Sequence, residues 1–187
     1  ILTDHQRPEQ LRACLESLGR QRDAPSWELL IGAPDDQAVH DLIGSLMPDA
    51  TIVMVPHGSP AKRRNALLPL ATGELILFLA DDVTVPSHLL QSIDGLAKRH
   101  PDIEVFGGPN LTPANSSYFQ LVQGAVLSSV VGSGPVRRRY GVRRAVEADE
   151  RWFTLCNLVI RRRAMTAFDG GLAGGEELLA QSRAAIE

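Results

Sequence analysis

The sequence predicts an α/β domain built around a largely parallel sheet. Short apolar runs alternate with amphipathic stretches along the chain, which is the pattern of strands separated by helices. One run, residues 75–79, is apolar throughout, as in a strand covered on both faces. The chain has 187 residues, of which 44% are hydrophobic, enough for one domain with a sizeable core. We therefore expect a single domain over residues 1–187, with helices flanking a mostly parallel sheet.

Composition excludes several other classes of protein. The formal net charge of -3 argues against a general nucleic-acid binder. No apolar run approaches the roughly 20 residues that span a bilayer. Two cysteines, Cys14 and Cys156, cannot build a disulfide scaffold, and their apolar surroundings predict buried free thiols.

The first half of the chain predicts regular alternation. Ile1, Leu2 and Thr3 resemble the end of a first strand. Leucines and a cysteine at helical spacing predict a helix over 11–18. Further helices are expected over 36–46 and 60–70 and from 86 onward, and strands over 27–31, 51–55, 74–79 and 103–106.

The second half is less regular. We expect a largely buried helix over 118–131, a long Gly/Arg-rich connection over 132–150, a strand over 153–160, a short helix over 162–168 and a last helix from 176. Nine of the nineteen Lys and Arg residues fall between positions 137 and 163. Such a basic region suits phosphate or an anionic acceptor, and a solvated surface is the alternative.

Asp81 and Asp82 follow directly on the apolar strand 74–79. Ligands of open α/β sheets bind beyond the carboxyl ends of the strands, so the pair is well placed for a site. Carboxylates are suitable ligands for Mg²⁺ or Mn²⁺ that shares its coordination with substrate phosphates. The alternative is that the two acids only open the next helix, where they interact favourably with its dipole.

Two other clusters carry polar chemistry. Glu176 and Glu177 follow Gly174-Gly175, and a carboxylate there could accept a proton from a sugar hydroxyl as a general base. The alternative is again an acidic helix start. The cluster Lys62–Asn65 at a predicted helix start suits phosphate, with a basic surface as the alternative.

Taken together, the motifs resemble those of the family 2 glycosyltransferases, whose fold is the GT-A nucleotide-diphospho-sugar transferase fold. The resemblance covers nearly the whole chain, and it depends on the order and spacing of short motifs. These are the first strand and loop over 2–8, the helix over 11–18, Arg64-Asn65, the run 71–79 into Ala80-Asp81-Asp82, Asn157 with the arginines after it, and Gly174–Glu177.

On the donor side, the resemblance implies that Asp82 holds a divalent metal, Mn²⁺ or Mg²⁺, on the donor diphosphate. Asp81 would contact the ribose or the water shell of the metal. Thr3 and Asp4 would lie against the nucleoside, and Arg64 near the base or the phosphates.

On the acceptor side, Glu177 matches the catalytic base and Glu176 the preceding acid that binds the acceptor. Three departures accompany this match. Ala80 replaces the commoner first Asp of the metal motif, and Glu177 replaces a frequent Asp. The segment 32–36 stands where the family has a uridine-contacting carboxylate, which is therefore absent or displaced to Asp35 or Asp36.

The resemblance implies an inverting, metal-dependent transferase that moves a sugar from a nucleoside-diphosphate donor to a hydroxyl of a saccharide or lipid-linked acceptor. Such transfer occurs in cell-surface polysaccharide synthesis. The donor would be a UDP-sugar, because uridine is the commonest donor nucleoside in the family. Residues 1–109 would form the nucleotide-sugar half and 110–187 the acceptor half. A cytoplasmic location is implied, with peripheral association at the inner face of a membrane left open. Two alternatives remain: a catalytically degenerate nucleotide-sugar-binding domain, and a sugar-phosphate nucleotidyltransferase. The second lacks support, because residues 4–8 do not form the expected Gly-rich loop.

Overall fold

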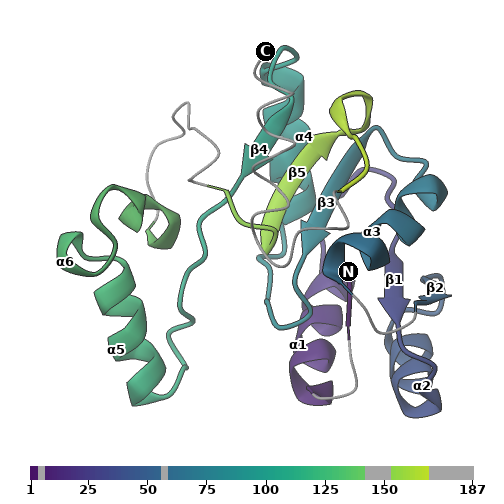
Figure 1. Ribbon diagram of the computed structural model, residues 1–187, viewed down its shortest axis with the longest axis horizontal. Coiled ribbons are helices and arrows are strands. Elements are labelled where there is room, and N and C mark those ends of the chain that lie inside the picture. The colour runs from purple at the N-terminus through teal and green to yellow at the C-terminus, as the bar shows by residue number, and fades with distance from the viewer. Residues whose placement is uncertain (4–6, 56–58, 142–152, 169–187) are drawn as a thin grey trace.

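The protein is a mixed α/β structure, seen in a computed structural model that describes residues 1–3, 7–55, 59–141 and 153–168 (Figure 1). Its strands form a parallel pair, β1 (Leu30–Ala33) with β2 (Thr51–Met54), and a three-stranded sheet in the order β3 (Leu75–Leu79), β5 (Asn157–Arg161), β4 (Val105–Gly107). The predicted α/β class is confirmed.

The first residues of the chain connect the two sheets. Leu2 forms parallel bridges with Gly32 of β1 and with Ala80 just after β3. The Ile1 carbonyl oxygen accepts from the Gly32 amide at 2.9 Å, and the Thr3 amide donates to the Gly32 carbonyl oxygen at 2.9 Å. Gly32 allows this approach, because a Cβ there would lie 2.8 Å from Leu2 Cδ2. The strands therefore follow the spatial order β2, β1, Leu2, β3, β5, β4.

The expectation of a mostly parallel sheet is wrong for β5. This strand pairs antiparallel with both β3 and β4, with Leu77 opposite Val159 and Phe106 opposite the same residue. The reason is that the chain enters β5 at the same end of the sheet at which it leaves β4. Asn110 Nδ2 donates to Thr154 Oγ1 at 2.8 Å, so the segment that leaves β4 lies beside the segment that enters β5.

The helices agree well with the sequence pattern. They are α1 (Pro8–Gly19), α2 (Gln37–Leu46), α3 (Pro60–Leu67), α4 (Leu89–Arg99), α5 (Tyr118–Leu127) and α6 (Val130–Ser133), with 3₁₀ turns at Leu68–Leu70, Gly134–Tyr140 and Arg162–Ala164. Asp36 caps α2 by accepting from the amides of Ala38 and Val39, at 2.9 and 3.4 Å. The predicted helix 60–70 becomes 3₁₀ from Leu68, because Pro69 has no amide hydrogen to continue an α-helix.

The core lies in layers on both faces of the strands. Leu11 and Leu15 of α1 pack with Ile31 of β1 and Ile43 of α2. Val159 of β5 packs with Ala97 of α4 and Phe106 of β4. Its strand neighbours Leu158 and Ile160 point the other way, toward Ala61 of α3 and Phe168. The carboxyl ends of β1 and β3 are thereby held beside Thr3.

Two burial predictions are wrong. Residues 75–78 of β3 are only half-buried, and only Leu79 at the end of this strand is buried, because a cavity borders it on the side of β1. The helix predicted over 118–131 is two helices, and none of its side chains is buried. In Figure 1, α5 and α6 lie apart from the sheet. Apolar character predicted burial there, but burial requires an opposing surface, and no described element supplies it.

Candidate functional site

Thr3 and Asp81 form the centre of a polar cluster at the carboxyl ends of neighbouring parallel strands. Thr3 Oγ1 donates to Asp81 Oδ2 at 2.9 Å, and both residues are buried. Leu2 and Ala80, the residues immediately before them, are bridge partners. Pairing of the two segments in parallel therefore brings together residues that are 78 positions apart in the sequence.

Asp82 is the more accessible carboxylate of the pair. Its side chain is 40% exposed, against 9% for Asp81. Arg7, at the start of α1, donates from Nη1 to Asp82 Oδ2 at 2.7 Å. Its Nη2 lies 3.6 Å from Asp81 Oδ1, so one guanidinium spans both acids.

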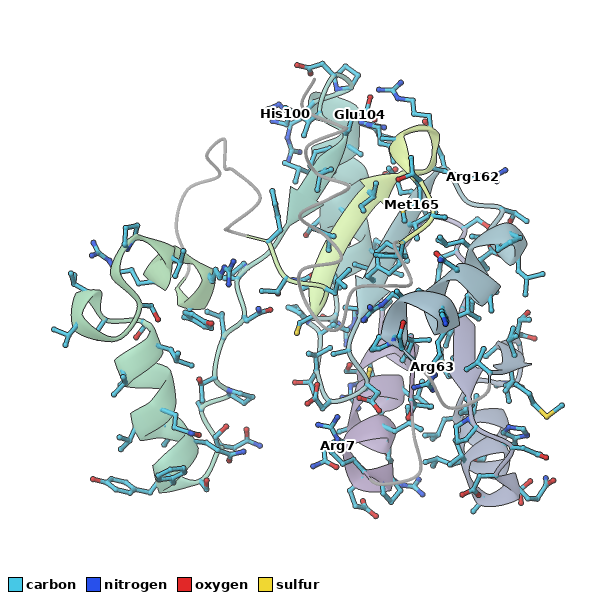
Figure 2. The ribbon with its side chains drawn as sticks, viewed as in Figure 1. Arg7, Arg63, His100, Glu104, Arg162 and Met165 are labelled. Carbon is cyan, nitrogen blue, oxygen red and sulfur yellow. The ribbon has the colours of Figure 1, made fainter. Side chains whose placement is uncertain are left out.

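Arg63 approaches the cluster from α3, on the other face of the strands (Figure 2). Its Nη2 donates to the Thr3 carbonyl oxygen at 2.7 Å, and its buried Nε has no hydrogen-bond partner. The guanidinium carbon of Arg64 lies 5.6 Å from the ring centroid of Phe168, a cation–π distance. Ser59 caps this helix by accepting from the Lys62 amide at 3.4 Å. In the predicted basic cluster, Arg63 therefore contacts Thr3, and Arg64 packs against Phe168 of the apolar core.

Asp35 follows β1 at the same edge as Thr3 and Asp81, and its side chain is exposed. Asp36 has a structural task, since its carboxylate caps α2. Of the two candidates for a displaced nucleoside-contacting carboxylate, Asp35 is therefore the one whose carboxylate is not used in capping.

Three predicted site residues, Asp4, Glu176 and Glu177, lie outside the described residues, as does the predicted last helix. The pairing of strands brings together Thr3, Asp81 and Asp82, with Asp35 at the same edge. Arg64 borders the same cavity as Thr3 and Asp81.

The donor set of Asp81 and Asp82 fits a divalent cation that shares its coordination with a ligand. Within the described part of the chain, no group of three or more His, Cys, Asp or Glu side chains converges. The two aspartates would thus supply one or two ligands, which is how Mg²⁺ is commonly held when water and phosphate oxygens complete its octahedron. Asp81 is buried and already accepts from the Thr3 hydroxyl, so Asp82, whose carboxylate is exposed, is the better candidate ligand.

Sequence reasoning assigned no role to Arg7, and it considered Arg63 only as a member of the cluster Lys62–Asn65 that suits phosphate. A usable signal for Arg7 is its position just after the first strand, since Asp82 follows a strand that is parallel to it. Parallel neighbours place the residues after their carboxyl ends side by side, so a cation after one strand and an acid after the other should meet.

Cys14 lies behind the site and is not a candidate nucleophile. It is fully buried, and its Sγ lies 3.7 Å from the Ala80 carbonyl oxygen. Burial raises the pKa of the Cys14 thiol to about 11, so it remains protonated at neutral pH. The prediction of a buried free thiol is confirmed for Cys14, whereas Cys156 is free and half-buried.

The arginines at the end of β5 and just after it are used in the fold. Arg161 is buried and donates to the carbonyl oxygens of Ala97 and His100 at the end of α4, at 2.8 and 3.0 Å. Arg163 forms an ion pair with Glu104 at 2.7 Å. Figure 2 shows Glu104, Arg162 and His100 at the opposite end of the molecule from Arg7. This part of the basic region does not face the carboxylates.

A cavity of about 570 Å³ extends from the site between β1 and β3. Thr3, Arg7, Arg63 and Asp81 border it at the polar end. Trp27, Leu29 and the half-buried side chains of β3 line its apolar remainder. The site is therefore continuous with a largely apolar cleft that is partly open to solvent. In the part of the chain that the structure describes, no helix is long and apolar enough to cross a bilayer.

Comparison with known proteins gives matches among solved structures. No protein-family model matches the chain, and no curated protein matches it. The chain is similar to S. aureus TarS, with a TM-score of 0.63 and 15% identity, over 99% of this chain and 32% of that one.

Two further TarS structures match. TarS 1-349 in complex with UDP gives a TM-score of 0.64 at 18% identity, over 100% of this chain and 54% of that one. TarS 1-349 in complex with UDP-GlcNAc gives 0.61 at 15% identity, over 98% and 52%. The chain thus spans between about a third and about half of these structures, and it shares their fold.

Proposed function

We propose that this chain is the GT-A domain of an inverting glycosyltransferase of family 2, with a donor half over residues 1–109 and an acceptor half over residues 110–187. It would take a nucleoside-diphosphate sugar, a UDP-sugar first of all, and transfer the sugar to a hydroxyl of a saccharide or lipid-linked acceptor. The observation that carries the proposal is the cluster of Thr3, Arg7, Asp81 and Asp82 beyond the carboxyl ends of parallel strands. The complexes of TarS with UDP and UDP-GlcNAc, in the same fold, support a nucleotide-sugar ligand.

In this proposal the described residues bind the donor and orient it. Asp81, fixed by the Thr3 hydroxyl, faces the ribose, and Asp35 at the same edge faces the base. Asp82 would hold Mn²⁺ or Mg²⁺ beside the diphosphate. When bound, such a cation neutralises charge that develops on a departing diphosphate.

Transfer itself would be a single in-line displacement. The acceptor hydroxyl oxygen forms a bond to the anomeric carbon while the bond from that carbon to the diphosphate oxygen breaks, which inverts the configuration. Glu177 accepts the hydroxyl proton, and Glu176 binds the acceptor. These two assignments come from the family resemblance.

The test is nucleotide binding by calorimetry with UDP, GDP and CDP, each with and without Mn²⁺, for the wild type and Asp82→Asn. We expect one diphosphate, UDP, to bind more tightly with Mn²⁺, and Asp82→Asn to abolish this enhancement because the cation loses its accessible carboxylate. Asp49→Asn, which removes an exposed carboxylate after α2, is the matched control and should keep it. Full metal enhancement in Asp82→Asn would remove Asp82 from the site.

A transfer assay beside the calorimetry separates binding from catalysis. Glu177→Gln should keep UDP binding and lower transfer at least a hundredfold, since the proton acceptor is lost. Loss of binding together with transfer would assign Glu177 a structural role instead.

A second function, binding of a nucleotide sugar without transfer, is favoured by one observation. Ala80 stands at the first position of the metal motif, and its bridge to Leu2 fixes this backbone in the sheet without adding a carboxylate. Metal-dependent UDP binding with no transfer to any saccharide or lipid-linked acceptor by the wild type would select this function.

A further inference from the structure

Arg7 occupies the place where a cation would meet the accessible carboxylate. Its guanidinium lies 2.7 Å from Asp82 Oδ2 and 3.6 Å from Asp81 Oδ1, and Thr3 Oγ1 takes the remaining oxygen of Asp81 at 2.9 Å. Three of the four carboxylate oxygens of the pair therefore already have a donor or a cation beside them.

A divalent cation bound through Oδ2 of Asp82 is incompatible with this arrangement, because Arg7 Nη1 already lies 2.7 Å from that oxygen. Such an ion lies about 2.1 Å from its carboxylate oxygen, which would place it within a few ångströms of the guanidinium. Like charges at that distance repel strongly where the site is partly shielded from water. The cation and Arg7 must therefore compete for Asp82.

The surroundings of Arg7 allow it to give way. Its side chain is 47% exposed, and it caps no backbone group of α1. Leaving Asp82 therefore breaks no core contact. A planar guanidinium also binds a diphosphate through paired N–H donors, as it binds a carboxylate.

We propose that Arg7 is a positioning residue of the donor site: it holds Asp82 when no donor is present, gives up this carboxylate to the divalent cation, and turns its guanidinium to the nucleoside diphosphate. This inference rests on the proposed function. Arg7 thereby couples the arrival of the cation to the arrival of the diphosphate.

The experiment measures the two ligands separately. Free Mn²⁺ is followed by electron paramagnetic resonance, and UDP without metal by calorimetry, for the wild type, Arg7→Gln, Arg7→Lys and Arg12→Gln. Arg12 is an exposed residue on the same helix, so its variant controls for the loss of one positive charge. Circular dichroism checks that each variant is folded.

We expect Arg7→Gln to bind Mn²⁺ three- to tenfold more tightly than wild type, because its competitor is gone, and to bind UDP alone about fivefold more weakly. Arg12→Gln should stay within twofold of wild type for both ligands. Arg7→Lys should fall between, because it keeps the charge but loses the forked contact.

The outcomes separate the two proposals. If the wild type binds UDP with Mn²⁺ but Arg7→Gln and Arg12→Gln bind Mn²⁺ equally tightly, only the role of Arg7 is overturned and the proposed function stands. If Arg7→Gln bound Mn²⁺ more weakly than wild type, the role of Arg7 would likewise be overturned. Wild type that binds neither Mn²⁺ nor any of UDP, GDP and CDP would overturn the proposed function and this inference with it.

Discussion

Two parts of the molecule differ in what holds them in place. The sheet body comprises the strands β1–β5 with the helices α1–α4, and the helical arm comprises α5, α6 and the 3₁₀ turn Gly134–Tyr140. In the body, side-chain hydrogen bonds join segments far apart in sequence, such as Thr3 to Asp81 and Asn65 to the Phe168 backbone. Side-chain hydrogen bonds within the arm are local, three residues apart, as between Ser117 and Gln120. Val131 of the arm is 100% exposed, while Leu15 of the body is 0% exposed.

This difference shows that apolar composition alone does not make a core. The arm is as apolar as the body, but its helices contact mainly each other and the turn after them. One backbone bond, from the Asn110 amide to the Arg139 carbonyl oxygen at 2.6 Å, joins that turn to the segment after β4. The body instead stacks helices on both faces of its strands. Stability should therefore depend on the body, and the site should inherit its rigidity from there.

The largest effect is expected from a cavity in the body. Leu15→Ala should lower the free energy of unfolding by about 3 to 5 kcal/mol, because the side chain is fully buried among α1, β1 and α2. Val131→Ala in the arm should leave it unchanged within error. Urea denaturation of both variants checks the contrast, and similar losses would mean that the arm is part of the same core.

A smaller effect is expected from the buried arginine that fixes the end of α4. Arg161→Leu should cost about 3 kcal/mol in urea denaturation, since three backbone carbonyl oxygens, those of Ala97, His100 and Ile103, lose their charged donor. Arg163→Gln, whose side chain is 60% exposed, should cost clearly less. An equal loss in both would show that the bonds of Arg161 add little.

The smallest of these effects concerns a set of hydrogen bonds, here called the polar tie, between the residues before β1 and those before β3. Glu28 accepts from the Thr72 amide at 2.6 Å, the Thr72 hydroxyl at 2.8 Å and the Gly73 amide at 3.1 Å. These bonds, led by that from the Thr72 amide, hold the pKa of Glu28 below its ordinary value. Because Glu28 is exposed, Glu28→Gln should cost only about 0.5 to 1 kcal/mol at pH 7.

The lowered pKa of Glu28 also predicts how the effect of Glu28→Gln on stability changes with pH. A carboxyl with a lowered folded pKa stabilises the protein above its unfolded pKa, and this stabilisation is lost as the pH falls through the folded value. The difference between wild type and Glu28→Gln in urea denaturation should therefore shrink between pH 5 and pH 3. A difference that is constant over this range would mean that the charge of Glu28 is not what stabilises the tie.

Much of the body could be predicted from the sequence. Helical spacing in 11–18 gave α1, Asp36 marked the start of α2, and the run into Asp81 gave β3. The strand predicted over 27–31 begins later, at Leu30, since Trp27 is exposed before the pairing with β2 begins. Strand ends depend on the partner strand, so they are the least predictable feature.

The site could be predicted in part. A carboxylate pair after a strand is a local signal, and it identified Asp81 and Asp82. The ion pair with Arg7 is not local, because it exists only when the first strand and β3 lie side by side. The same holds for Arg63, which reaches the Thr3 carbonyl oxygen across 60 positions.

By itself, the sequence determined the α/β class, most helices and the position of the acidic pair, because these depend on periodicity, capping and chain order within a few residues. The tertiary structure decided that β5 runs antiparallel, that α5 remains exposed and that Arg7 meets Asp82. Each of these depends on which distant segment lies opposite, and that is settled by packing and strand pairing rather than by local preference.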